Sequence, residues 1–156
     1  MGVTFYCPRC WAENRGDDKL CRQCGAMLVE DTDFISKLIT ALHHPEPQTP
    51  LRAAQILGEL REHRAVEPLS WLLLHAEDGY QRAAAAQALG EIGDERAIEP
   101  LASAIGEAPL VARVAAAQAL GRFPALEARI ALRQALRDPN DAVRMAASAA
   151  MRKLST

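Results

Sequence analysis

Four cysteines lie close together near the start of the chain, and their type and spacing suit metal binding. They form two Cys-x-x-Cys pairs, Cys7 with Cys10 and Cys21 with Cys24, which are separated by ten residues. Each pair can form a tight turn whose backbone amides point at the sulfurs, and the spacer lets the chain reverse direction. Four thiolates favour a tetrahedral ion and leave no open coordination position, which is typical of a structural site. We therefore predict one structural zinc ion on Cys7, Cys10, Cys21 and Cys24, with an iron centre of the rubredoxin type as the main alternative.

The segment around these cysteines, CPRCWAENRGDDKLCRQCGAML, resembles the short zinc-ribbon family found at the ends of many bacterial proteins. The resemblance covers residues 5–28 and implies a small β ribbon. Members usually carry glycine after each second cysteine, and Gly25 fits whereas Trp11 does not. Because glycine tolerates a positive φ that tryptophan adopts less readily, we expect the first turn to differ slightly from the second. The Trp11 indole then either packs on the adjoining helices or contacts a partner.

The remainder of the chain repeats every 31 or 32 residues. The block Ala-Ala-Gln-x-Leu-Gly occupies residues 53–58, 85–90 and 116–121, and a weaker copy occupies 147–152. Prolines, glycines and Asp-Gly or Asp-Pro-Asn sequences divide each unit into two helices. The first helices are expected near 33–44, 65–75, 97–106 and 127–137, and the second near 51–62, 80–92, 111–122 and 141–154.

Apolar residues recur on one face of each expected helix. On the second helices they occupy positions 53, 57 and 60, then 85, 89 and 92, then 116, 120 and 123, then 147, 151 and 154. The first helices carry the matching pairs Leu38/Leu42, Leu69/Leu73, Leu101/Ile105 and Leu132/Leu136. Spacing of i, i+4 and i+7 indicates one buried face, and a single helix pair cannot bury that face without neighbours. The pattern therefore predicts an all-α stack of helix pairs.

This pattern resembles HEAT repeats of the short bacterial kind found in phycobilin-lyase-like proteins. Arg82, Arg113 and Arg144 match that family's arginine at the start of the second helix, and residues 141–144 give the closest local match. The resemblance covers about residues 33–154 and implies a right-handed α-solenoid in which these arginines bridge neighbouring repeats. The expected organisation is a zinc ribbon over residues 1–30 and a solenoid over 33–156, with repeats at about 33–63, 64–95, 96–126 and 127–156.

No catalytic motif is found in the sequence. The histidines are His43, His44, His63 and His75; they form no His-x-x-x-His pair, and none is followed by glutamate. Iron hydroxylases built on HEAT repeats carry His-Glu pairs, so that chemistry is not expected here. A glycine-rich phosphate loop and a nucleophile elbow are also missing. We therefore predict that the chain is not an enzyme and has no catalytic residue.

Three features are candidates for partner binding. Trp71 stands where the other units have polar residues, and Leu74 lies on the same helix face, so together they form a small apolar patch. Tryptophan is enriched at interface hot spots. The candidate partner-binding residues are Trp11, Trp71, Leu74 and a ladder of exposed amides on the concave side, Gln55, Gln87 and Gln118.

The C-terminal repeat has no polar capping helix, although repeat arrays usually need a polar terminal face. Met145, Met151 and Leu154 are therefore candidates for contact with a second copy of the chain, and we consider a homo-oligomer through this end. Residues 33–127 hold eight basic and thirteen acidic groups, a net of −5, while residues 128–156 hold six and two, a net of +4. Such asymmetry can orient a partner.

Composition narrows the class of function. With 18 basic and 20 acidic residues the net charge is −2, which argues against nucleic-acid binding. No apolar run approaches the roughly 20 residues that cross a bilayer, and no signal peptide is evident, so we expect a cytoplasmic protein. The leading prediction is a non-catalytic adaptor or scaffold for protein–protein interaction. The family resemblance implies an alternative, a subunit related to bilin lyases that acts on a tetrapyrrole-bearing protein, and a nucleic-acid-associated zinc ribbon is a third reading.

Overall fold

The computed structural model describes residues 4–7, 9–15, 18–28 and 33–155, and it begins with a small β ribbon. Strand β1 (Thr4–Tyr6) pairs antiparallel with β2 (Glu13–Arg15). An antiparallel bridge joins Leu20 to Met27. Each cysteine pair therefore lies between two paired segments of backbone. The predicted boundary between ribbon and solenoid falls at residues 29–32, outside the described residues.

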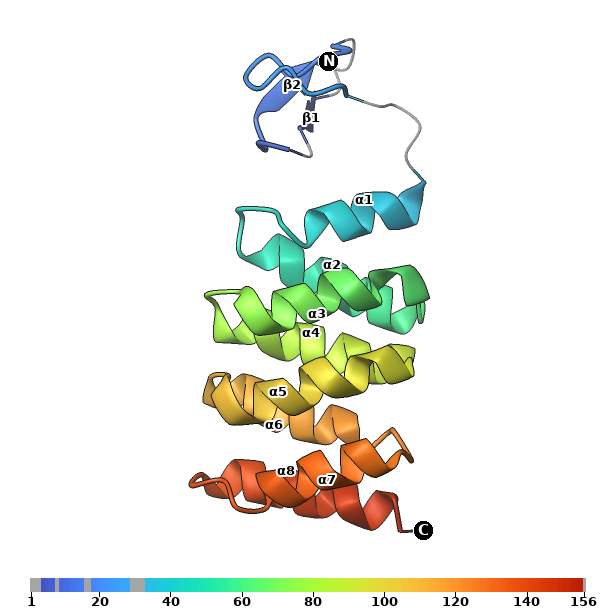
Figure 1. The fold of residues 1–156 in the computed structure, drawn as a ribbon. Coiled ribbons are helices and arrows are strands. Elements are labelled where there is room, and N and C mark those ends of the chain that lie inside the picture. The colour runs from blue at the N-terminus through green and yellow to red at the C-terminus, as the bar shows by residue number, and fades with distance from the viewer. Residues whose placement is uncertain (1–3, 8, 16–17, 29–32, 156) are drawn as a thin grey trace.

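Four helix pairs follow and stack in a row, with the two ends of the chain at opposite ends of the stack (Figure 1). The helices are α1 (Phe34–Ala41), α2 (Gln48–Glu59), α3 (Val66–His75), α4 (Gly79–Ile92), α5 (Ile98–Glu107), α6 (Leu110–Leu120), α7 (Leu126–Ala135) and α8 (Asp141–Lys153). Short 3-10 turns at His63–Ala65 and Glu95–Ala97 lead into α3 and α5. The predicted all-α solenoid of helix pairs is confirmed.

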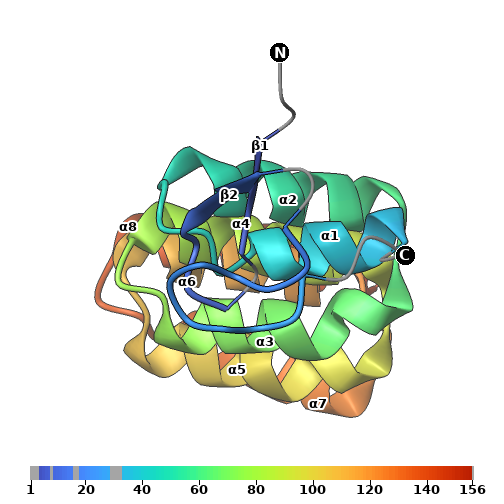
Figure 2. The ribbon, with the colours of Figure 1, turned by 90° about the horizontal axis from the view of Figure 1, so that it is seen from above.

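The pairs form two layers. Helices α2, α4, α6 and α8 contact one another in sequence, and so do α3, α5 and α7. Viewed from above, α3, α5 and α7 lie on one side of the molecule and α2 lies on the other (Figure 2). We call the two layers the second-helix layer and the first-helix layer. No helix in the described part of the chain is long and apolar enough to cross a membrane.

Local signals explain where the helices begin and end. The side chains of Asp78 and Asn140 cap α4 and α8 by accepting hydrogen bonds from backbone amides two residues later. Gly93 ends α4 in the left-handed conformation with φ of 72°. Helix α2 begins at Gln48, three residues before the predicted start, because the Glu46 carboxylate accepts the Thr49 amide and so satisfies the first turn.

The predicted apolar columns form one continuous core, with two exceptions. Leu57, Leu89 and Leu120 are fully buried on successive second helices, as expected. Leu60 is exposed, contrary to the prediction, because α2 ends one residue before it and the chain turns away. Leu136 is also partly exposed, at 38%, and it too lies one residue beyond the end of its helix, because α7 ends at Ala135.

Glycines set the spacing within the second-helix layer. A Cβ atom added to Gly90 would lie 2.8 Å from Ala119 Cβ and 3.0 Å from Ala119 Cα. At Gly121 the corresponding distances to Ala150 are 2.7 and 2.9 Å, and Gly58 meets Ala88 in the same way. Adjacent second helices thus approach so closely that only glycine fits at these positions. This contact explains why the glycine of the Ala-Ala-Gln-x-Leu-Gly block recurs.

Candidate metal centre and interaction surfaces

The two cysteine pairs fold into turns with the same backbone pattern. Trp11 donates its amide hydrogen to the Cys7 carbonyl at 2.9 Å, and Gly25 donates to the Cys21 carbonyl at 2.9 Å. Trp11 has a φ of 60° and Gly25 a φ of 68°. The expectation that the first turn would differ is therefore wrong. Trp11 adopts the left-handed conformation that glycine would normally supply, at a cost of about 1–2 kcal/mol.

The four sulfurs lie at distances that suit a shared metal ion. Cys7 Sγ is 3.6 Å from Cys24 Sγ, Cys10 Sγ is 3.5 Å from Cys21 Sγ, and all four lie within 4.8 Å of one another. Tetrahedral ligands at the usual zinc–sulfur bond length of about 2.3 Å would be about 3.8 Å apart. The cluster can therefore hold a metal ion with little rearrangement.

The local electrostatics also favour a bound cation. Backbone amides of Cys24 and Gln23 donate to the Cys21 sulfur and lower its pKa to about 6. The amide of Ala12 lowers the pKa of Cys10, but burial and the neighbouring thiols outweigh it and raise that pKa to about 12. Four thiolates packed together repel one another, and a divalent ion compensates that charge.

Asn14 joins the two halves of the ribbon, and sequence reasoning missed it. Its side chain is buried, donates to the Ala12 carbonyl at 2.6 Å and accepts the Arg22 amide at 3.1 Å. One side chain thereby connects strand β2 to the turn that carries Cys21 and Cys24. The sequence offers little indication of this role, because a single asparagine between two cysteine pairs is also common in turns and on exposed surfaces.

The ribbon contacts the solenoid through aromatic rings, which we call the junction contact (Tyr6, Trp11 and His44). The Trp11 and His44 ring centroids are 4.5 Å apart with an interplanar angle of 66°. Tyr6 meets the same imidazole edge-on at 5.9 Å. The His44 Nδ1 atom accepts the Glu46 amide at 3.0 Å, which fixes the ring in the loop between α1 and α2. Trp11 therefore packs on the solenoid, in agreement with one of its two predicted roles.

Trp71 lies at the centre of a second group of rings, which we call the ring cluster (His43, Trp71 and His75). The His43 imidazole meets the indole at 5.0 Å, and the His75 imidazole stacks on it at 5.1 Å with a 22° interplanar angle. His75 Nδ1 bonds to the Trp71 carbonyl at 2.9 Å. The indole is still 50% exposed, and Leu74 on the same helix is half-buried. The structure thus adds two imidazoles to the predicted apolar patch.

For the other predicted surfaces the structure shows how exposed the residues are, while their binding roles and their place on a concave side stay predictions. Gln55, Gln87 and Gln118 are all exposed, and the first two donate to glutamates one turn later. At the C-terminal end Met145 is 72% exposed, whereas Met151 and Leu154 are half-buried.

The three aligned arginines act mainly within their own units. Arg82 donates to the Leu74 carbonyl in the last turn of α3. Arg113 and Arg144 donate to carbonyls in the loops that precede their own helices, those of Ala108 and Asp138. Only Arg113 also reaches the next unit, through an ion pair of 3.0 Å with the nearly buried Asp138. The predicted bridging role therefore holds for one of the three.

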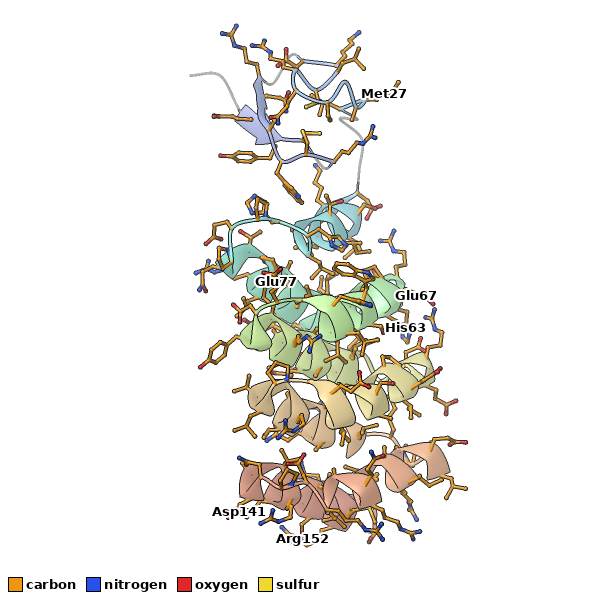
Figure 3. All side chains as sticks on the ribbon, turned by 60° about the vertical axis from the view of Figure 1, so that its left-hand side comes forward. Met27, His63, Glu67, Glu77, Asp141 and Arg152 are labelled. Atoms are coloured by element: carbon orange, nitrogen blue, oxygen red, sulfur yellow. The ribbon has the colours of Figure 1, made fainter. Side chains whose placement is uncertain are left out.

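Another set of contacts joins neighbouring repeats at one edge of the stack. His63 and Glu67 lie together at this edge (Figure 3). Asp94 from the next unit pairs with His63 Nδ1 at 2.8 Å and with Arg96 at 2.8 Å, and Arg96 also reaches Glu67 at 3.9 Å. The Arg96 guanidinium, together with His63, holds the pKa of Asp94 well below its usual range.

Comparison with known proteins places the chain among helical-repeat proteins. Residues 35–115 match the family model described as HEAT repeats, and residues 112–138 match the PBS lyase HEAT-like repeat. Human deoxyhypusine hydroxylase, solved in complex with glycerol, aligns with a TM-score of 0.70 and 24% identity over 81% of this chain. The complex of CpcE and CpcF of phycocyanin lyase from Nostoc aligns with a TM-score of 0.57 and 22% identity over 88% of this chain and 69% of that one. No curated protein sequence matches the chain.

These likenesses show the fold, and the chain spans 45% of the hydroxylase. They also correct the prediction that the chain is not an enzyme, because both solved structures come from enzymes and one repeat is of the lyase type. The prediction relied on the absence of familiar motifs. A solenoid can serve a reaction by holding its substrate, without a nucleophile motif of its own.

Proposed function

Since this chain belongs to the HEAT-repeat family, we propose that it binds a tetrapyrrole-bearing protein and serves a bilin-lyase-like reaction on it. The lyase-type repeat at residues 112–138 supports this reading, and so does the likeness to CpcE and CpcF, which form a complex. A protein partner is therefore part of the proposal. The observation that carries it is the ring cluster.

The ring cluster is suited to binding because it combines a flat apolar surface with polar groups. Aromatic residues make up 4% of the chain, yet a half-exposed indole stands here between two imidazoles. Exposed tryptophans contribute strongly to interfaces, and imidazoles add hydrogen-bond donors and acceptors. His43 also directly precedes His44 of the junction contact, so the ribbon lies next to this surface.

We further propose that the resident metal ion is zinc. Four thiolates in a closed tetrahedral set suit zinc, and the ion would hold Cys7, Cys10, Cys21 and Cys24 in the fold that positions Trp11. Free thiolates of this kind require a reducing compartment, which supports a cytoplasmic location. Metal analysis of the purified protein should give one zinc per chain. One iron per chain, with the visible absorption of an iron–thiolate centre, would contradict this.

Binding and reaction can be tested with an apo-phycobiliprotein and a free bilin. We expect the chain to bind the apo-protein and to increase covalent bilin attachment, measured as bilin fluorescence after denaturing electrophoresis. Trp71→Ala should weaken binding at least tenfold and slow attachment. Tyr80→Ala is the matched control, because Tyr80 is 67% exposed on α4. Equal binding by both variants would exclude the ring cluster, and no binding by the unaltered chain would refute the function.

A further inference from the structure

A hollow of about 570 Å³ opens between α5 and α7, in the first-helix layer, away from the ring cluster. We call it the α5–α7 groove. Gly106 and Ile130 line its apolar part, and Arg133, Arg137 and Asp138 line its polar part. This volume lies within the range of about 300–1,000 Å³ that is usual for ligand pockets.

The groove is open because one unit lacks a side chain. Gly106 aligns with His43, Leu74 and Arg137 in the other units. A Cβ added to Gly106 would meet no atom within 4 Å, unlike one added to Gly90. Close packing therefore does not require glycine at position 106. The missing side chain leaves space beside Ile130.

The polar side of the groove carries positive charge that the protein itself does not neutralise. Arg133 and Arg137 are four residues apart and both are exposed. In the described part of the chain, no carboxylate forms an ion pair with either of them. Asp138 is only 7% exposed and is already paired with Arg113. Two guanidinium groups are thus available to a ligand.

The spacing of the charges indicates what kind of ligand fits. Arg133 lies on α7 and Arg137 lies in the turn that directly follows it, and both line the groove. Each guanidinium can therefore hold its own carboxylate in a bidentate pair. A single small anion would not fill the groove or cover Ile130. We propose that the α5–α7 groove binds a short acidic segment of a partner protein, with two carboxylates on Arg133 and Arg137 and an apolar side chain over Gly106.

This proposal is independent of bilin chemistry, so the two can fail separately. The probe is a fluorescein-labelled helical peptide with two glutamates four residues apart and a leucine between them. Its matched control replaces both glutamates with glutamine. Fluorescence anisotropy with the full chain should give at least tenfold tighter binding to the acidic peptide, and binding should weaken with added salt.

Three variants locate the binding. Gly106→Leu fills the groove in open space and should abolish binding, with an unchanged circular dichroism spectrum. Arg133→Gln combined with Arg137→Gln should weaken it at least tenfold. Arg52→Gln, an exposed arginine on α2, is the control and should bind as the unaltered chain does. The proposal would be overturned if the acidic peptide still bound to Gly106→Leu, or if both peptides bound equally well. Displacement of the peptide by millimolar inorganic phosphate alone would also overturn it.

Discussion

Gly90 offers a direct test of how the repeats are held together. In Gly90→Ala the new methyl group would lie 2.8 Å from Ala119 Cβ and 3.0 Å from Ala119 Cα. The second atom belongs to the backbone of α6, so no rotamer change can relieve the contact. Overpacking of this kind costs about 1–3 kcal/mol, and the involvement of backbone places the cost near the upper end.

The same substitution also gains helix propensity, which must be separated from the clash. Replacing a helical glycine with alanine gains about 1 kcal/mol. Gly106→Ala is the matched control, because it has a similar gain and its Cβ meets nothing within 4 Å. We expect Gly90→Ala to lower the free energy of unfolding by about 2 kcal/mol and Gly106→Ala to raise it by up to about 1 kcal/mol. The difference of about 3 kcal/mol measures the clash alone.

Urea denaturation followed by circular dichroism provides the assay, with the slope checked for constancy. Adding Ala119→Gly to Gly90→Ala removes one of the two clashing atoms and should restore part of the lost stability. If Gly90→Ala is as stable as Gly106→Ala, the close approach of α4 and α6 does not exist as described. The account of the repeated glycine would then fail as well.

Three further predictions concern charges and the metal centre. Asp138→Asn leaves the largely buried Arg113 without its ion pair and should lower the free energy of unfolding by about 3 kcal/mol; a loss below 0.5 kcal/mol would contradict the pairing. Folding lowers the pKa of Asp94, so the ionised carboxylate stabilises the folded state. This stabilisation is complete at pH values above the unfolded pKa of about 4 and is lost progressively as the pH falls below it. Asp94→Asn should therefore be destabilising at pH 7 and less so at pH 3 in denaturation experiments, and an equal effect at both would refute this. In a Trp71→Phe background, chelation of the metal should shift Trp11 fluorescence to longer wavelength while helical circular dichroism is retained, because only the ribbon depends on the ion.

The solenoid could be predicted because its physical signals repeat. A block that recurs every 31 or 32 residues gives four chances to identify each buried position, and Leu57, Leu89 and Leu120 are buried as expected. The prediction failed at two positions where a helix ends earlier than expected. Leu60 and Leu136 follow the same pattern, but each lies one residue beyond the end of its helix, so neither is held against the core.

The metal cluster was predictable for a similar reason, since cysteine spacing fixes where the sulfurs can meet. The contacts around it were not. The Trp11 backbone takes a conformation that its residue type disfavours, and its indole meets His44, which lies 33 residues later. Such a contact depends on how two separately folded segments come together, and no local pattern encodes it. Asn14 was missed for a different reason, because its partners Ala12 and Arg22 lie within the ribbon and an isolated asparagine does not identify them.

Side-chain size connects the glycine contacts with the α5–α7 groove. In the second-helix layer, glycine faces alanine at each step, so the helices approach to backbone contact. In the first-helix layer the predicted core positions carry leucine and isoleucine, and neighbouring helices make fewer close backbone approaches. The hollow between α3 and α5 and the α5–α7 groove lie in this layer. Substitutions that loosen the second-helix layer should therefore change the grooves across the molecule, and Gly90→Ala should alter peptide binding even though it lies outside the groove.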